Sequence, residues 1–210
     1  MNLAELRAAF RRDAMDQAEP YGWANKDVDA WLNEAVEEAC IRARLLRFTD
    51  EYSMLPGDES AEIDHRCFEI TRALWCEADG RQRELDQLDI LERDANRRAI
   101  ADGPRGFVHR DGVLDLDAPA REAATLKLEG YRLACPMRAE TDRPEIDRLH
   151  HRHLVDWALA CAYRIPDVEL EDASRALAAE ARFERHFGPS PGARLRRAQT
   201  ANTPHRNQLW

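Results

Sequence analysis

The chain has 210 residues, and its 31 basic and 40 acidic side chains give a formal net charge of −9 at pH 7. This length is enough for one domain with a substantial core, and no apolar run approaches the roughly 20 residues that a membrane-spanning helix needs. The opening residues also lack the apolar stretch of a signal peptide. We therefore expect a soluble, intracellular protein with no membrane segment.

The charge is distributed unevenly along the chain. Residues 188–210 contain four arginines and no acid, so leaving them out changes the net charge from −9 to −13. An acidic body is a poor match for the phosphates of nucleic acid, whereas it suits the wall of a channel that DNA passes without binding. Acidity that serves solubility alone explains the charge equally well.

The cysteines follow neither a disulfide framework nor a zinc-binding pattern. They are odd in number and contain no CxxC pair. We expect reduced thiols that mostly act as small core residues, at Cys40, Cys67, Cys76, Cys135 and Cys161.

Two amphipathic helices are predicted at the start of the chain. The first covers about residues 3–18, with Asn2 as its N-cap and Glu5 as the capping-box partner. The second covers about residues 26–47, follows Asn25 as its N-cap, and carries one continuous apolar stripe. Together they form a helical hairpin.

Aromatic residues lie in the connection of this hairpin and in the buried stripes of two predicted helices, 26–47 and 147–165. Tyr21 and Trp23 lie in the connecting turn, and active-site aromatics are one interpretation of them. Structural anchors that lock helices together are more common. We therefore predict Tyr21, Trp23, Trp31 and Trp157 to be structural anchors.

The middle of the chain changes to β-compatible residues separated by turn signals. A hairpin is expected over about residues 63–77 and 83–90, around the turn Asp79-Gly80, and a short charged helix over 91–100. Three short strands are expected at 106–110, 113–116 and 124–134. Residues 63–134 are therefore predicted to be a β-rich insertion with a small antiparallel sheet.

Two further helices are predicted near the end, at about residues 147–165 and 168–187. Pro166 ends the first, and Gly188-Pro189 ends the second. The predicted fold is therefore α+β and mainly α. It has a four-helix core of two helical hairpins, the small antiparallel insertion, and an extended C-terminal arm. The body covers residues 1–187 and the arm 188–210.

One cluster has the residue types of a metal site: His150, His151 and His153, with Asp147 upstream. Zinc needs three or four converging ligands, and one face of a helix supplies two. A packing role for His150 is the better interpretation, so we predict no metal and no cofactor. No sequence motif for a nucleophile, a phosphate loop or a metalloprotease is present, so we predict no catalytic residues and no enzyme.

The basic arm is the remaining candidate for binding. Its arginines favour nucleic acid only weakly, because no aromatic residues are interleaved with them. A partner-binding peptide that orders on binding, anchored by an indole, is the preferred interpretation, and an inert solvated tail is the third. The predicted partner-binding residues are Arg194, Arg196, Arg197, Arg206 and Trp210.

An ordered set of short motifs runs through residues 3–188. The opening has an LRxxFRxD helix from Leu6, a turn Pro20-Tyr21-Gly22-Trp23, the sequence WLNEA from Trp31, and RARLL ending at Leu46. Later pieces follow in order: Gly103-Pro104, Leu114–Pro119, Tyr131–Leu133, Pro144–Ile146 and Phe183–Gly188. This set resembles the head-to-tail adaptor (connector) proteins of tailed bacteriophages.

The resemblance implies a virion structural protein without catalysis. Such adaptors form a homo-oligomeric ring, typically of twelve copies, under the portal protein. The ring extends the channel for genomic DNA, which passes without sequence-specific binding, and it joins the portal to a tail protein of the nozzle or tail tube. The expected location is the neck or tail of the virion, after assembly in the host cytoplasm.

Portal docking through an extended C-terminal segment is common in this family, which makes residues 188–210 the candidate docking arm. Two other functions stay open at the sequence level. One is a nucleic-acid-binding regulator that uses the basic arm, and the other is a metal-dependent enzyme centred on the histidines.

Overall fold

The chain divides into two compact units in the computed structural model, which describes residues 1–96, 103–110, 112–166 and 171–191. The helical unit consists of Met1–Leu46 and Leu133–Ser190, and the β unit is built on Arg47–Arg132. The helical unit is therefore discontinuous in sequence, and the β unit is inserted into it.

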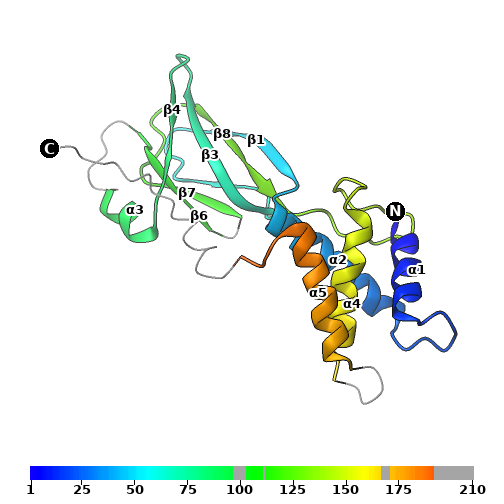
Figure 1. Ribbon diagram of the computed structural model, residues 1–210. Coiled ribbons are helices and arrows are strands. Elements are labelled where there is room, and N and C mark those ends of the chain that lie inside the picture. Colours follow the sequence, from blue (N-terminus) through cyan, green and yellow to red (C-terminus); the bar gives the residue numbers. More distant parts are fainter. Residues whose placement is uncertain (97–102, 111, 167–170, 192–210) are drawn as a thin grey trace. The chain divides into compact units, whose positions relative to one another are not determined.

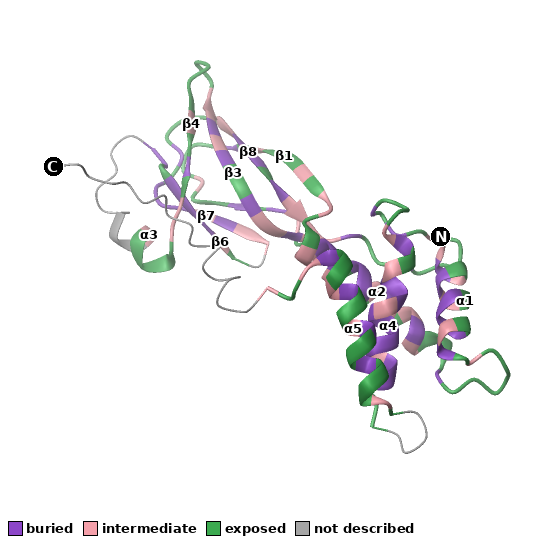
Figure 2. Cartoon of the chain, in the orientation of Figure 1, coloured by how far each residue is buried: buried purple, intermediate pink, exposed green. Residues whose placement is uncertain are grey.

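Four α-helices and one 3-10 turn form the helical unit (Figure 1). They are α1 (Leu3–Ala14), α2 (Asn25–Ala43), the 3-10 turn η1 (His151–His153), α4 (Leu154–Tyr163) and α5 (Ala173–Phe187). Helix α4 contacts each of the other three, and eight of its ten residues are buried. The other helices bury one face each against it, as the colouring of α5 in Figure 2 shows.

The local sequence explains the starts of α1 and α5, whereas the predicted N-cap of α2, Asn25, is the first residue of that helix, and Ala24 precedes it without a side-chain cap. Asn2 and Glu5 form the capping box at the start of α1, and the Asp172 side chain accepts a hydrogen bond from the Arg175 amide at the start of α5. Helices α1 and α2 end in left-handed residues, Met15 (φ 60°) and Arg44 (φ 50°). Both helices are therefore shorter than the sequence pattern suggests.

The β unit contains eight strands among the described residues. They are β1 (Arg47–Met54), β2 (Ser60–Glu62), β3 (Cys67–Glu77), β4 (Gln82–Glu84), β5 (Asp86–Gln87), β6 (Gly106–Arg110), β7 (Val113–Leu116) and β8 (Ala124–Arg132). One short helix, α3 (Ile90–Asn96), lies between β5 and β6 in sequence.

These strands form two four-stranded sheets. The first has the order β1-β8-β3-β4 and is antiparallel, and the second has the order β2-β7-β6-β5, with β5 and β6 parallel. Side chains of both sheets share one core, in which Trp75, Leu126 and Leu128 come from the first sheet and Phe107 and Leu114 from the second. The β unit therefore has a core of its own.

The predicted fold class is wrong. The chain has five helices and eight strands in its described residues, with about 36% helix and 25% strand, so it is not a mainly helical protein with a small antiparallel insertion around a four-helix core. Strand β1 is an example of an element that the sequence pattern did not predict. Its inward face carries Phe48, Tyr52 and Met54 at alternate positions, but Asp50 interrupts the series. The strand also follows directly on a strong helical pattern, which hid this short alternation.

No helix in the described residues is long and apolar enough to cross a membrane.

Candidate functional site

The connection between α1 and α2, where the family motif is densest, is organised by one buried arginine. The Arg11 side chain forms an ion pair with Asp16, and it donates to the Trp23 carbonyl at 2.6 Å and to Asn25 Oδ1 at 2.8 Å. Asp16 in turn accepts a hydrogen bond from the Gly22 amide at 2.8 Å. This network holds both ends of the connecting loop against the end of α1.

The two aromatic residues of the loop lie in different environments. Trp23 is buried, with its ring centroid 5.7 Å from that of Phe10 and 5.8 Å from that of Tyr163, both edge to face. Tyr21 is 40% exposed, and the Arg11 guanidinium carbon lies 4.2 Å from its ring centroid. Trp23 thus packs in the helical core, whereas Tyr21 covers the buried charge from outside.

The other two predicted anchors also lie in the helical unit. Trp31 is half-buried, and its ring centroid is 6.2 Å from that of Phe10. Trp157 is buried, and its ring centroid is 5.1 Å from that of Phe183. Each of these tryptophans therefore packs against an aromatic residue of another helix.

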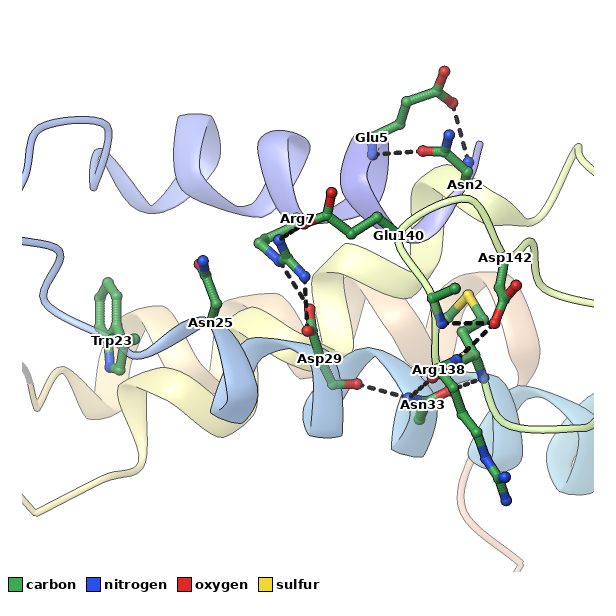
Figure 3. Close-up of polar contacts among 12 residues, drawn as sticks. Asn2, Glu5, Arg7, Trp23, Asn25, Asp29, Asn33, Arg138, Glu140 and Asp142 are labelled. Carbon is green, nitrogen blue, oxygen red and sulfur yellow. Dashed lines mark hydrogen bonds and ion pairs between the residues drawn. The ribbon is translucent and has the colours of Figure 1, made fainter.

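A second polar network ties α1 and α2 to the loop that precedes η1 (Figure 3). Arg7 binds both carboxylate oxygens of Asp29, at 2.9 and 2.7 Å, and also Glu140 at 3.0 Å. Hydrogen bonding to Asp29 is the main reason why the pKa of Arg7 is raised. Asn33 pairs with both backbone groups of Met137, at 3.1 and 2.7 Å. These side chains give the segment after the β unit a fixed position on the helices.

His151 serves packing in the helical unit. It is 3% exposed, its Nε2 lies 3.0 Å from the Ile146 carbonyl, and its Nδ1 lies 2.7 Å from the Met1 nitrogen. Both ring nitrogens are thus occupied by protein groups, which leaves neither available to a metal ion.

The other two histidines of the predicted cluster meet a third histidine that the sequence did not bring to notice. His150 Nδ1 lies 2.9 Å from His186 Nε2, and the His153 ring stacks on the His186 ring with centroids 3.6 Å apart. Stacked rings do not point their nitrogens at a common centre. Among the residues that the structure describes, no group of three or more His, Cys, Asp or Glu side chains can hold a metal ion.

No disulfide forms among the cysteines in the described part of the chain. Burial raises the pKa of both Cys67 and Cys161 to about 12, which keeps these thiols protonated and unreactive at neutral pH. Cys40 is buried as well, whereas Cys135 is exposed.

Arg42 fixes the end of α5. Its side chain is 1% exposed and pairs with Glu38 at 2.9 Å and Glu184 at 3.7 Å, and its guanidinium carbon lies 4.8 Å from the Trp157 ring centroid. It also donates to the Gly188 carbonyl at 3.4 Å. The residue at which the predicted arm begins is therefore attached to the helical core.

The predicted partner-binding residues of the arm lie outside the described residues: Arg194, Arg196, Arg197, Arg206 and Trp210. The side chains of the helical unit thus hold its helices together and fix the position of Gly188, where the predicted arm begins. Within the described ranges they form no catalytic constellation.

The comparisons with known proteins agree with the motif order in the sequence. A family model described as SU10 adaptor protein matches residues 1–208, which is nearly the whole chain. No curated protein matches this chain. The resemblance that the motifs carried is confirmed: the chain belongs to the SU10 adaptor protein family, a family of bacteriophage head-to-tail adaptors.

Proposed function

We propose that this protein is a structural component of the phage neck, where copies of it form a ring beneath the portal and join the portal to the tail. The observation that carries the proposal is the family match over residues 1–208. The proposed ring has twelve copies and extends the channel through which genomic DNA passes.

The polar networks of the helical unit support a structural role. Several of its side chains bind carboxylates and carbonyls of the protein itself, among them Arg7, Arg11 and Arg42. Buried groups of this kind fix geometry, and that is what a ring subunit needs. The acidic body adds a channel surface that does not retain DNA.

We further propose that Gly188–Trp210 is the portal-docking arm. An arm that orders only on binding has low affinity alone, but many arms on one ring engage together, so avidity makes assembly depend on the portal. The arginines of the arm and the Trp210 indole are the proposed contacts.

The test is binding to the portal of the same virus. A chain that ends at Gly188 is expected to stay folded and to bind the portal at least about tenfold more weakly, because the proposed arginine and tryptophan contacts are missing. Light scattering and negative-stain imaging of the mixture measure binding and ring formation.

Two full-length variants sharpen this test. Changing the four arm arginines to glutamine, or Trp210→Ala, is expected to weaken portal binding, whereas Arg12→Gln on the exposed side of α1 is the matched control and is expected to leave it unchanged. Normal portal binding by the chain that ends at Gly188 would refute the docking role of the arm.

A further inference from the structure

The face of α5 that points to solvent is basic. All of its exposed residues with a formal charge are arginines: Arg175, Arg182 and Arg185. The two acids of this helix, Glu180 and Glu184, are half-buried and pair with Arg164 and Arg42 of the same unit. The exposed face of α5, visible in Figure 2, is therefore positive.

The exposed face of α2 is acidic. Glu34 and Glu37 are exposed, and Asp27 is half-buried. In the described part of the chain, neither glutamate forms an ion pair or a hydrogen bond through its side chain, and the same holds for Arg185 on α5. The exposed cation of α2, Lys26, lies in the first turn, about 12 Å along the helix from Glu34 at 1.5 Å per residue. Each helix thus carries exposed charge that its own described residues do not neutralise.

The charges of the two faces have the same spacing. In each helix the second and third charged residues follow the first by seven and ten positions: Asp27, Glu34 and Glu37 in α2, and Arg175, Arg182 and Arg185 in α5. Such positions lie on one side of a helix over about 15 Å. When two such helices run in the same direction, each arginine meets one acid, whereas in opposite directions the spacings do not match.

Within one copy, α2 and α5 run in the same general direction. Arg42, near the C-terminal end of α2, lies 3.7 Å from Glu184 and donates to the Gly188 carbonyl at 3.4 Å, so the C-terminal ends of both helices meet (Figure 1). Neighbouring copies in a ring of twelve are related by a rotation of only about 30°. Helix α2 of the next copy therefore keeps nearly the direction that the match in spacing requires.

Charge disfavours a two-fold contact through either face. Two α5 faces would place arginines against arginines, two α2 faces would place acids against acids, and like charges across an interface repel. Both helices bury their other faces against α4, so their exposed faces point in different directions. A contact between α5 and α2 of another copy is heterologous, and repetition of a heterologous contact gives a ring or a filament.

We propose that the exposed face of α5 binds the exposed face of α2 in a second copy of this chain, and that this contact joins neighbouring subunits of the ring. Closure of the contacts into a ring rests on the proposed function, whereas the contact itself does not. Each face also has an exposed alanine three residues after its first charge, Ala178 on α5 and Ala30 on α2. These small side chains allow the two helices to approach closely.

The test uses full-length variants in which one face is reversed in charge: Arg182→Glu/Arg185→Glu on α5, and Glu34→Lys/Glu37→Lys on α2. Sedimentation velocity at about 0.5 mM protein and about 20 mM salt, where exposed charges are little screened, measures self-association. The unchanged protein is expected to associate. Each double variant is expected to have a dissociation constant at least about tenfold higher, because attraction becomes repulsion.

A mixture of the two double variants is the decisive sample. Both faces of the α5 variant are acidic and both faces of the α2 variant are basic, so every contact between unlike chains is attractive. The mixture is therefore expected to regain the association that each variant lacks alone. Arg12→Glu, at a side chain on α1 that is 61% exposed, is the control and is expected to change the dissociation constant less than about twofold.

A second pair of variants guards against loss of folding. Arg182 also pairs with Asp156 at 2.6 Å, and Arg185→Glu combined in a mixture with Glu37→Lys leaves that ion pair intact. These single variants are expected to show the same loss and recovery, by about threefold. Circular dichroism at 222 nm verifies that every variant is folded.

Three results would overturn the proposal: an unchanged protein that is monomeric under these conditions, a folded double variant that associates as tightly as the unchanged protein, and a mixture of folded variants that stays monomeric. Failure of the neck proposal is distinguishable from failure of this contact. Association that follows the charge exchange, without any portal binding, refutes the neck role alone. Portal-bound rings built from either double variant refute this contact alone.

Discussion

At the residue scale, Arg11 carries the buried charge on which the connection between α1 and α2 depends. Its side chain is 7% exposed and that of its partner Asp16 11%, so neither charge is well solvated. Removing one partner of a buried pair leaves the other uncompensated, which destabilises a protein more than the pair itself stabilises it. Arg11, which belongs to the LRxxFRxD motif that begins at Leu6, therefore holds the loop between α1 and α2 in place.

We predict that Arg11→Met lowers the free energy of unfolding of the helical unit by about 3 kcal/mol, because Asp16 and the Trp23 carbonyl lose their partner. Urea unfolding followed by circular dichroism at 222 nm measures this. Arg12→Met is the control: its side chain is 61% exposed and lies 3.6 Å from Asp13, so the expected change is below about 0.5 kcal/mol. Equal effects of the two substitutions would contradict the assigned role.

At the element scale, the end of α5 is packed on η1 through imidazole rings. The pKa of His186 is lowered, first by burial and then by the neighbouring His153 and His150, while Asp156 acts in the opposite direction. The unfolded chain therefore binds more protons than the folded one between the lowered pKa and the ordinary value near 6.5. The contribution of His186 to stability is complete above about pH 6.5 and declines as the pH falls below it.

We predict that acidification from pH 7.5 to pH 5 loosens α5 more in the unchanged protein than in His186→Gln, which removes the titrating group. Amide hydrogen exchange across α5, measured at both pH values and corrected for the intrinsic rate, reports the difference. His65→Gln in the β unit, at a side chain that is 89% exposed, is the control and should keep the full pH dependence. A pH dependence that is unchanged in His186→Gln would refute the assignment.

Strand β8 depends on a close approach at Gly130. A Cβ atom there would lie 2.1 Å from the Glu69 carbonyl oxygen and 2.8 Å from Cε1 of Phe48, and β3 has irregular register opposite this position. The backbone of β3 thus occupies the space of a side chain, so glycine is required by packing and not by its φ angle.

We predict that Gly130→Ala destabilises the β unit by about 2 kcal/mol or more, because the sheet must shift to accept one methyl group. Thermal unfolding followed by the amide resonances of β3 and β8 is the measurement, because it reports the β unit alone. Glu129→Ala, at the neighbouring exposed position, is the control, with an expected loss below about 1 kcal/mol. Unchanged stability in Gly130→Ala would show that the sheet relaxes freely.

At the scale of the whole molecule, the β unit enters and leaves the helical unit at adjacent points. Arg47 at the start of β1 pairs with Tyr131 near the end of β8, so the two connections to the helical unit leave from neighbouring strand ends. Each unit has its own core of buried residues. The insertion is therefore removable in principle without opening the helical core.

We predict that replacing residues 47–132 with a linker of about four glycine and serine residues leaves a folded helical unit, since paired strands lie only about 5 Å apart. Far-UV circular dichroism and dispersion of amide resonances test this, and isolated 47–132 provides the reciprocal experiment. A disordered helical unit would show that its core needs the β unit.

Particular residues show how much of this architecture the sequence can predict. The capping box of Asn2 and Glu5 and the stripe from Val28 to Ala39 are local patterns, and both lie in helices. The alternation of Leu126 and Leu128 likewise lies in β8. Strand β1 was not found in this way, because Asp50 interrupts the alternation of Phe48, Tyr52 and Met54 and most of its other side chains are exposed.

For the candidate sites, too, the sequence predicts local patterns but not contacts between distant residues. The sequence drew attention to His150 and His153 as a pair on one helix, but both contact His186, which is 36 residues from His150.

The sequence by itself determined the helices with capped ends and apolar stripes, and it determined the family, because both are encoded in local order along the chain. Only the tertiary structure decided the pairing of β1 with β8, the burial of Arg11 with Asp16, and the contact of His150 and His153 with His186. In each of these features, the residues meet only when the surrounding unit is packed. Such contacts cannot be predicted from local periodicity.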